Sequence, residues 1–249
     1  MSEKFSSTLI HFLESLRNFL VILKRSRFSP ELLDLTLFRT LIKIWPATMV
    51  SVPCLLNAYN LSRLIDKKNL KGAIVECGVW KGGCVGLMGK ASNSRPIWLF
   101  DSFEGLPEPI EMDGERAIEY ANQQKQGNLQ SIGKCVGRID EVKELLFSKL
   151  KIEKERVHFI QGWFQHTLAR EKRNVGSIAL LRLDGDWYES TKVCLDELYD
   201  QVVEGGYIII DDYFCWEGCK KAVDEFFMTR NLNIHLIQID DFGIYFIKK

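Results

Sequence analysis

The sequence predicts an α/β fold built on a doubly wound, mostly parallel, Rossmann-like sheet with an antiparallel C-terminal strand. Apolar runs of strand length alternate with segments of helical spacing along residues 73–229. The run at 177–183 is almost continuously apolar, which is typical of a strand buried on both faces of a parallel sheet. Two late apolar segments, 234–239 and 243–247, are separated by a short turn and predict an antiparallel hairpin. Alternating β/α units that end in a hairpin are the pattern of a doubly wound sheet.

A helical N-terminal extension is expected at 1–70, ahead of a sheet domain at 71–249. Residues 5–24 carry apolar side chains at helical spacing, and further helices are expected at 31–44 and 47–67. We expect this extension to act as a lid over the site or to contact another subunit.

The helix expected at 5–24 has two interpretations. Packing against the domain or a partner subunit is the simpler one. The basic residues after it, Lys24, Arg25 and Arg27, leave a membrane-surface anchor as the alternative. We expect no transmembrane segment, because no apolar run reaches membrane-spanning length.

Within residues 71–249 the expected elements follow one another in order. Strands are expected at 73–76, 96–101, 157–160, 177–183 and 205–210. Helices are expected at 82–91, at 138–151, after the strand at 177–183, and at 217–229. Residues 107–137 are polar and irregular, and we expect a mobile lid there, with a disordered loop as the alternative.

Charge and cysteine content exclude some classes of function. Lys and Arg total 33, as do Asp and Glu, so no basic excess supports nucleic-acid binding. The seven cysteines are odd in number and scattered, and none forms a CxxC pair. This pattern disfavours a zinc site and indicates reduced thiols in a cytoplasmic protein.

The stretch 73–83 predicts a buried strand, a tight glycine turn and the start of a helix. Gly78 allows the turn and Gly82 allows close approach, at the strand end where open α/β sheets bind ligands. The glycine spacing does not match the GxGxxG dinucleotide motif. Glu76, directly before the turn, suits a cationic ligand such as the amino group of S-adenosylmethionine. A purely structural glycine turn is the alternative.

An acidic residue, Asp101, also ends the second strand. It lies about 25 residues after Glu76, where such an acid typically accepts hydrogen bonds from a ribose diol, so a nucleoside is implied. Trp163 or Phe164 is a candidate to pack on an adenine, and a place in the core is an equal alternative. Further cofactor-binding candidates beside these strand ends are Val79, Ser102, Gln161, Gly162 and Asp184.

Three carboxylates at two strand ends predict a metal site. Asp184 follows the strand at 177–183, and Asp211 and Asp212 follow the strand at 205–210. If these strands are neighbours, the carboxylates converge and raise one another's pKa unless a cation compensates. Oxygen ligands of this kind suit Mg²⁺. Capping of the following helix by one of the three is the structural alternative.

With these motifs identified, the chain resembles the macrocin O-methyltransferase family of S-adenosylmethionine- and Mg²⁺-dependent sugar O-methyltransferases. The matching stretches are TMVS at 48–51, VECGVWKGG at 75–83, DSFEGLP at 101–107, GWF at 162–164, LRLDGDWYEST at 181–191 and GGYIIIDDY at 205–213. The resemblance implies a class I methyltransferase domain. It also implies that Glu76, Gly78 and Asp101 contact the cofactor, and that Asp184, Asp211 and Asp212 hold the metal.

The expected reaction is methyl transfer to a hydroxyl of a sugar, a glycosylated natural product or a glycan. The metal would position vicinal hydroxyls and lower the pKa of the attacking one. Asp184 is the expected proton acceptor, with Asp186 and His166 as weaker candidates. A catechol-type O-methyltransferase and a non-catalytic interaction module on the same fold are the alternatives. The expected partners are a small-molecule or glycan acceptor and further copies of the chain in a dimer or tetramer.

Overall fold

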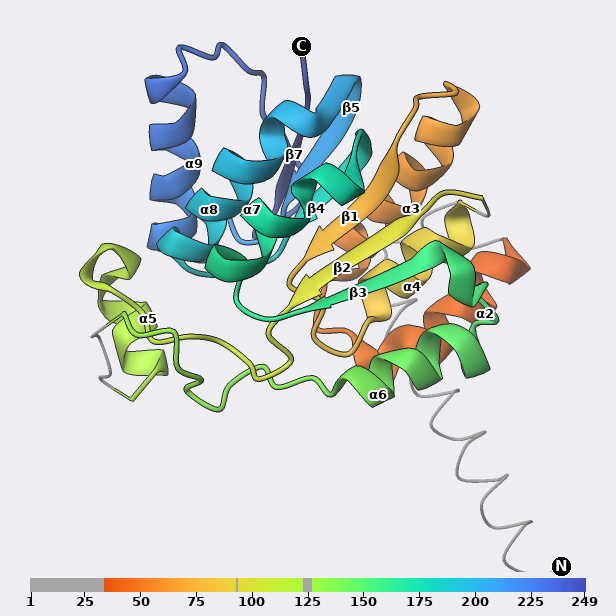
Figure 1. Ribbon diagram of the computed structural model, residues 1–249, viewed down its shortest axis with the longest axis horizontal. Helices are drawn as coiled ribbons and strands as arrows, with labels where there is room; N and C mark the ends of the chain where they lie inside the picture. Colours follow the sequence, from red (N-terminus) through yellow and green to blue (C-terminus); the bar gives the residue numbers. More distant parts are fainter. Residues whose placement is uncertain (1–33, 93, 123–126) are drawn as a thin grey trace, which may run out of the picture.

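The computed structural model describes residues 34–249, except residue 93 and residues 123–126. These residues form a seven-stranded sheet with helices on both faces (Figure 1). The strands are β1 (Ala73–Cys77), β2 (Ile97–Asp101), β3 (Val157–Gln161), β4 (Ile178–Leu183), β5 (Val202–Ile210), β6 (Ile237–Gln238) and β7 (Ile244–Ile247).

The strand order is β3-β2-β1-β4-β5-β7-β6. Strands β1 to β5 pair in parallel, whereas β7 runs antiparallel to β5 and to β6. The predicted α/β fold, with a mostly parallel sheet and an antiparallel C-terminal strand, is confirmed. The C-terminal hairpin is shorter than expected, because only two residues of 234–239 pair as a strand.

The α-helices are α2 (Leu35–Ile44), α3 (Val52–Lys67), α4 (Gly83–Ala91), α5 (Gly114–Tyr120), α6 (Ile139–Lys143), α7 (Phe164–Val175), α8 (Tyr188–Leu198) and α9 (Glu217–Thr229). Short 3₁₀ turns lie at Trp45–Ala47, Glu111–Asp113, Lys154–Arg156 and Tyr199–Gln201, and α6 continues as a π-helical turn at Glu144–Lys149. The sequence did not predict α5 or α7. Helix α7 buries only Thr167, Leu168 and Val175, so few apolar residues mark it in the sequence.

Helix α3 packs on the sheet itself, and α2 packs on α4. Asp34 caps α2, Ser51 caps α3, and Pro53 lies in the first turn of α3. Ile65 of α3 belongs to the same hydrophobic core as Leu180 of β4. The helix expected at 5–24 lies outside the described residues. The division of the chain at residue 70 and the lid or subunit-contact role stay predictions.

Two hydrophobic cores lie on opposite faces of the sheet. Helices α2, α3, α4 and α6 cover one face, and α7, α8 and α9 cover the other (Figure 1). Along β1, Val75 and Cys77 face the second core and Ile74 faces the first. Because side chains alternate along a strand, Glu76 points toward the first core, on the α4 side. Its partner across β4 in the strand register is Arg182.

The described part of the loop at 107–137 is a folded segment rather than an irregular insertion. Asp113 is 1% exposed, and its Oδ1 accepts a hydrogen bond of 2.6 Å from the backbone N–H of Tyr188 at the start of α8. The indole N–H of Trp187 donates to the carbonyl oxygen of Pro107 at 2.9 Å. These contacts tie the loop to α8, and its motion as a lid stays a prediction.

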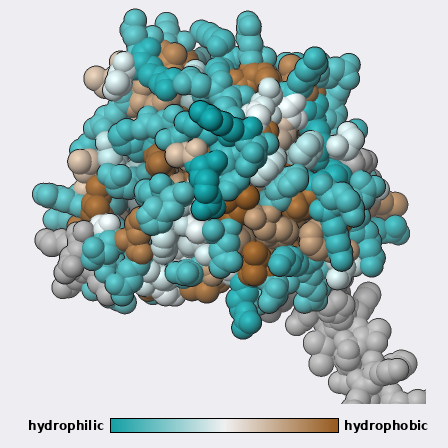
Figure 2. All heavy atoms as spheres, viewed as in Figure 1, coloured by the Kyte–Doolittle hydropathy of each residue, from teal (hydrophilic) through white to brown (hydrophobic). Residues whose placement is uncertain are grey.

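On the side of the molecule seen in Figure 2, the surface is mostly hydrophilic, with hydrophobic side chains in smaller groups. Among the described helices, none has the length and apolar character needed to cross a membrane.

Gly78 is predicted to tolerate no side chain. Its φ is 88°, and a Cβ there would lie 1.7 Å from the carbonyl oxygen of Asp184. Gly78→Ala should destabilise the protein by more than the roughly 1–2 kcal/mol expected for a left-handed residue alone. Gly133 is the matched control, because its φ is 73° and a Cβ there would meet no atom within 4 Å. Urea unfolding of both variants measures the difference, and equal costs would contradict the close approach of the two strand ends.

Candidate active site

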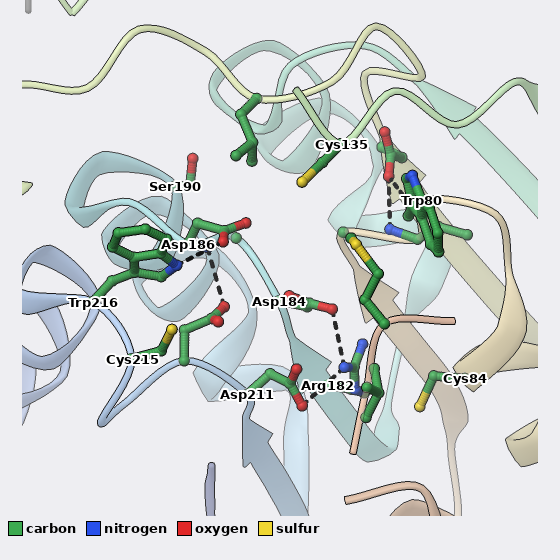
Figure 3. Close-up of a pocket in the computed structure, with 18 of the residues that line it drawn as sticks. Trp80, Cys84, Cys135, Arg182, Asp184, Asp186, Ser190, Asp211, Cys215 and Trp216 are labelled. Atoms are coloured by element: carbon green, nitrogen blue, oxygen red, sulfur yellow. Dashed lines mark hydrogen bonds and ion pairs between the residues drawn. The ribbon is translucent and has the colours of Figure 1, made fainter. Parts of the chain in front are cut away.

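The carboxyl ends of β1, β2, β4 and β5 open into a cavity of about 660 Å³. This is the edge at which open α/β sheets bind ligands. Residues 47–51 form part of the wall from the N-terminal side. Tyr120 and Cys135 contribute from the loop at 107–137, and Phe242 contributes from the turn between β6 and β7. Figure 3 shows the acidic centre of this cavity.

Arg182 lies at the base of the cavity with its side chain 2% exposed. Its Nη1 donates to Glu76 Oε1 at 2.8 Å. Its Nη2 forms ion pairs with Asp184 Oδ2 at 3.0 Å and with Asp211 Oδ1 at 2.9 Å, although neither contact has hydrogen-bond geometry (Figure 3). One guanidinium therefore faces three carboxylates from three adjacent strands.

The pKa values follow this imbalance of charge. Burial raises the pKa of Glu76 to about 8, with Arg182 opposing the rise. Burial also raises the pKa of Asp211 to about 6, again against the effect of Arg182. Burial alone would lower the pKa of Arg182, but the surrounding carboxylates, first Asp211, hold it well above its usual value. Arg182 is therefore charged, and its single positive charge does not balance the three carboxylates around it.

A second group of carboxylates lies beside the first. Oxygens of Asp184, Asp186 and Asp212 lie within 4.8 Å of one another. Burial, with the charge of Asp184 next, raises the pKa of Asp186 to about 8. Burial and the charge of Asp186 raise the pKa of Asp212 well above its usual value. Carboxylate oxygens gathered without enough cations are a donor set that fits a hard divalent ion such as Mg²⁺.

The structure brings the three predicted metal ligands to one end of the cavity, but only two of them belong to the close group of carboxylates. Asp184 and Asp212 belong to the close group, whose third member is Asp186 rather than Asp211. Asp211 lies next to them with one oxygen on Arg182. His166, the weaker candidate for proton acceptor, lies in α7 outside the cavity wall.

Among the predicted cofactor-binding residues, six line the cavity: Gly78, Val79, Asp101, Ser102, Trp163 and Asp184. Gly82, Gln161, Gly162 and Glu76 lie outside its wall. Contact of Glu76 with the cofactor stays a prediction. Glu76 is 1% exposed and lies behind Arg182, because its position on β1 faces the core under α4.

Asp101 holds the glycine turn in place. Its Oδ2 accepts hydrogen bonds from the backbone N–H groups of Val79 at 2.6 Å and Trp80 at 2.9 Å, and its Oδ1 accepts one from Phe103 at 2.6 Å. A carboxylate has about four acceptor positions, so about one is left for a ligand hydroxyl. Its contact with a ribose stays a prediction.

Sequence reasoning missed Arg182 altogether. A signal was present, because an arginine within a continuously apolar strand needs a buried acid as partner. Glu76 and Asp101 were the two acids in the other expected strands, and the choice between them depends on the register between β1 and β4, which brings Glu76 and Arg182 side by side.

Removal of the guanidinium should cost far more stability than removal of a comparable one elsewhere. Arg182→Met leaves buried carboxylates uncompensated, so we expect a loss of about 3–5 kcal/mol. The loss should grow as the pH rises above about 6, the pKa of Asp211, because the Asp211 carboxylate then carries charge without a partner. Below that pH Asp211 is protonated and needs the guanidinium less.

Arg156→Met is the control for this variant. Arg156 is partly buried and donates to the carbonyl oxygens of Arg95 and Ser92, so its loss should cost about 1.5–3 kcal/mol without a trend above pH 6. Urea unfolding in EDTA at pH 5.5 and pH 8 measures both. Equal, pH-independent losses would contradict the charge imbalance.

Known proteins match this chain in sequence and in fold. The family model described as macrocin-O-methyltransferase (TylF) matches residues 39–248. The demethyldecarbamoylnovobiocin O-methyltransferase of Streptomyces niveus is 36% identical over 209 residues, covering 81% of this chain and 76% of the relative. A 31% identical relative from Streptomyces olivaceus, 8-demethyl-8-(2,3-dimethoxy-alpha-L-rhamnosyl)-tetracenomycin-C 4'-O-methyltransferase, aligns over 215 residues, covering 83% of this chain and 78% of the relative.

Solved structures agree with the sequence matches. The O-methyltransferase NovP has a TM-score of 0.70 and 33% identity to this chain, covering 81% of this chain and 82% of NovP. The calicheamicin methyltransferase CalS11, at 20% identity, shares the fold with a TM-score of 0.63, covering 95% of this chain and 91% of CalS11. The family match, the relatives and the cavity at the strand ends lead to one conclusion: this chain belongs to the macrocin O-methyltransferase (TylF) family and is an S-adenosylmethionine-dependent O-methyltransferase.

Proposed function

We propose that this enzyme methylates a hydroxyl of a sugar that is already attached to a larger uncharged molecule, with the help of Mg²⁺. The name of the tetracenomycin relative, a 4'-O-methyltransferase of a rhamnosyl compound, supports a sugar acceptor. The observation that carries the proposal is the set of carboxylates at one end of the cavity, because it would supply metal ligands and a proton acceptor together: Asp184, Asp186, Asp211 and Asp212.

In this proposal Asp184, Asp211 and Asp212 hold the ion. Asp184 and Asp212 lie in the close carboxylate group, and Asp211 has one oxygen, Oδ2, that is not engaged by Arg182. Arg182 and Glu76 keep Asp184 and Asp211 in place from behind. A bound Mg²⁺ would polarise a hydroxyl of the acceptor and lower its pKa.

Asp186 is the proton acceptor in this proposal, in place of Asp184. Asp184 is already a proposed metal ligand and forms an ion pair with Arg182, whereas Asp186 forms no ion pair with any described residue. Burial also favours protonation of Asp186, whose pKa rises to about 8. Asp186 would take the hydroxyl proton at Oδ2, since Oδ1 already accepts a hydrogen bond from Trp216. The hydroxyl oxygen then gains the methyl group from S-adenosylmethionine, which leaves as S-adenosylhomocysteine.

The charge of the cavity favours a neutral acceptor. Six aspartates line it: Asp101, Asp184, Asp186, Asp211, Asp212 and Asp240. Arg182 is the only cationic side chain among the described lining residues, and it is already engaged by carboxylates. A diphosphate would meet repulsion here, whereas a sulfonium and a divalent ion would be attracted. Attachment of the sugar to its aglycone, with loss of the nucleoside diphosphate, should therefore precede methylation.

The roles of the carboxylates predict a separation between metal affinity and rate. Asp212→Asn and Asp211→Asn should each lower the affinity for Mg²⁺ at least about tenfold, because even outer partners of a metal are worth that much. Asp186→Asn should leave the affinity within about threefold and lower kcat by about 100-fold or more, the usual worth of a general base. Calorimetric titration with Mg²⁺ and initial rates measure the two effects.

The opposite result would reassign the ligands. If Asp186→Asn weakens Mg²⁺ binding and Asp211→Asn does not, then Asp186 is the third ligand. Activity that survives both EDTA and the double change Asp211→Asn with Asp212→Asn would exclude the metal mechanism.

A panel of acceptors tests the substrate class. Neutral rhamnosides and other glycosides should be methylated with a kcat/KM at least about 100-fold above that of the corresponding nucleoside diphosphate sugars, since repulsion of like charges costs several kcal/mol. Catechols complete the panel. Turnover of the nucleotide sugars alone would contradict the neutral acceptor, and turnover of the catechols alone would support the catechol-type alternative.

A further inference from the structure

Trp216 makes a hydrogen bond to the carboxylate cluster that none of the roles above requires. It precedes α9 as its N-cap residue, and its side chain is 9% exposed. Its indole Nε1 donates to Asp186 Oδ1 at 2.8 Å. Figure 3 shows the indole lying on the far side of Asp186 from Asp184 and Arg182.

The ring of Trp216 is occupied by neighbouring side chains. Trp187 packs edge-on, with ring centroids 5.0 Å apart and an interplanar angle of 72°. Tyr120 of α5 approaches to 5.6 Å, and the guanidinium carbon of Arg116 lies 4.8 Å from the ring centroid. These contacts leave little of the ring face for stacking on an acceptor. The polar N–H is the part of Trp216 that acts on the cavity.

The backbone of Asp186 is also held in an unusual conformation. Its φ is 56°, in the left-handed region, and a 2.6 Å hydrogen bond from Trp187 N to Gly185 O closes a tight turn around it. Its own N–H points to Asp212 Oδ2 at 3.3 Å. A conformation of this kind costs free energy and persists where the surroundings enforce it, often at functional sites.

We propose that Trp216 is a positioning residue for methyl transfer. It fixes the Asp186 carboxylate through Oδ1 and leaves Oδ2 toward the acceptor hydroxyl. This rests on the role of Asp186 in the proposed function. The support comes from three sides: the turn at 185–187 sets the direction of the side chain, Trp216 sets its rotation, and Arg116 and Tyr120 hold Trp216 from the loop at 107–137.

Trp187 provides a matched control. It is 1% exposed, and it belongs to the same edge-on pair of rings. Its indole N–H makes a hydrogen bond of 2.9 Å, but to the carbonyl oxygen of Pro107 instead of to a carboxylate. A phenylalanine at either position loses one indole and one hydrogen bond from the same aromatic cluster. Only the change at Trp216 frees Asp186.

The first test compares Trp216→Phe with Trp187→Phe in the full chain, with S-adenosylmethionine, Mg²⁺ and the best glycoside of the panel. Trp216→Phe should lower kcat about 10–100-fold, the rate equivalent of a hydrogen bond to a charged group. The KM values for S-adenosylmethionine and for the glycoside should stay within about threefold of those of the unchanged enzyme. Trp187→Phe should lose a similar amount of thermal stability but less than about threefold in kcat. Equal effects on kcat would overturn the proposal.

Two further measurements distinguish loss of the hydrogen bond from misfolding. They also distinguish failure of the positioning proposal from failure of the proposed function. Replacement of Trp216 by 3-benzothienylalanine puts sulfur in place of the N–H and keeps the shape of the ring, and it should reproduce the loss in kcat. In nitrogen-15 spectra, the indole resonance that disappears in Trp216→Phe should shift in Asp186→Asn, and the resonance of Trp187 should stay. If Asp186→Asn keeps full kcat, the proton acceptor is wrong. If it loses kcat while both Trp216 variants keep theirs, only the positioning proposal is wrong.

Discussion

The buried guanidinium of Arg182 is the interaction on which the rest of the site depends. It lies under the cavity, and carboxylates from β1, after β4 and after β5 surround it. Neither partner is tolerable alone in this position, because an unpaired buried charge costs several kcal/mol. The register of β1 against β4 sets Glu76 opposite Arg182, and the glycine turn after β1 packs on the backbone of Asp184. The geometry of the site therefore depends on both the strand pairing and the glycine turn.

The same arrangement leaves the site with more carboxylates than positive charges. Asp186 and Asp212 add to the carboxylates that Arg182 already faces, and burial raises the pKa of both. Such a cluster is costly in the empty protein and favourable once cations enter. The methyl donor carries a sulfonium, and the proposed ion carries two charges, so binding of these ligands offsets the cost of the cluster. In the proposed function, affinity for donor and metal therefore comes from the same unfavourable electrostatics.

Aromatic side chains connect this charged centre to the loop at 107–137. Trp187 anchors Pro107 at the beginning of the loop, and Trp216 contacts Tyr120 and Arg116 of its helix α5. The two indoles pack on each other, and one of them reaches the carboxylates. The loop at 107–137 and the Asp186 carboxylate are therefore connected through the contacts of two packed indoles.

Local patterns in the sequence determined the β/α alternation, the turn at Gly78 and the gathering of Asp184 with Asp212. This was possible because apolar period reports which segments are strands, and parallel strands end at one edge. Tertiary structure alone decided the partners. Register paired Arg182 with Glu76 and turned Glu76 away from the cavity, and a left-handed backbone brought Asp186 into the cluster. Helix α7 was missed because it contains few buried apolar residues. A sequence shows the face on which a side chain lies, whereas the packing of distant segments decides what that side chain meets.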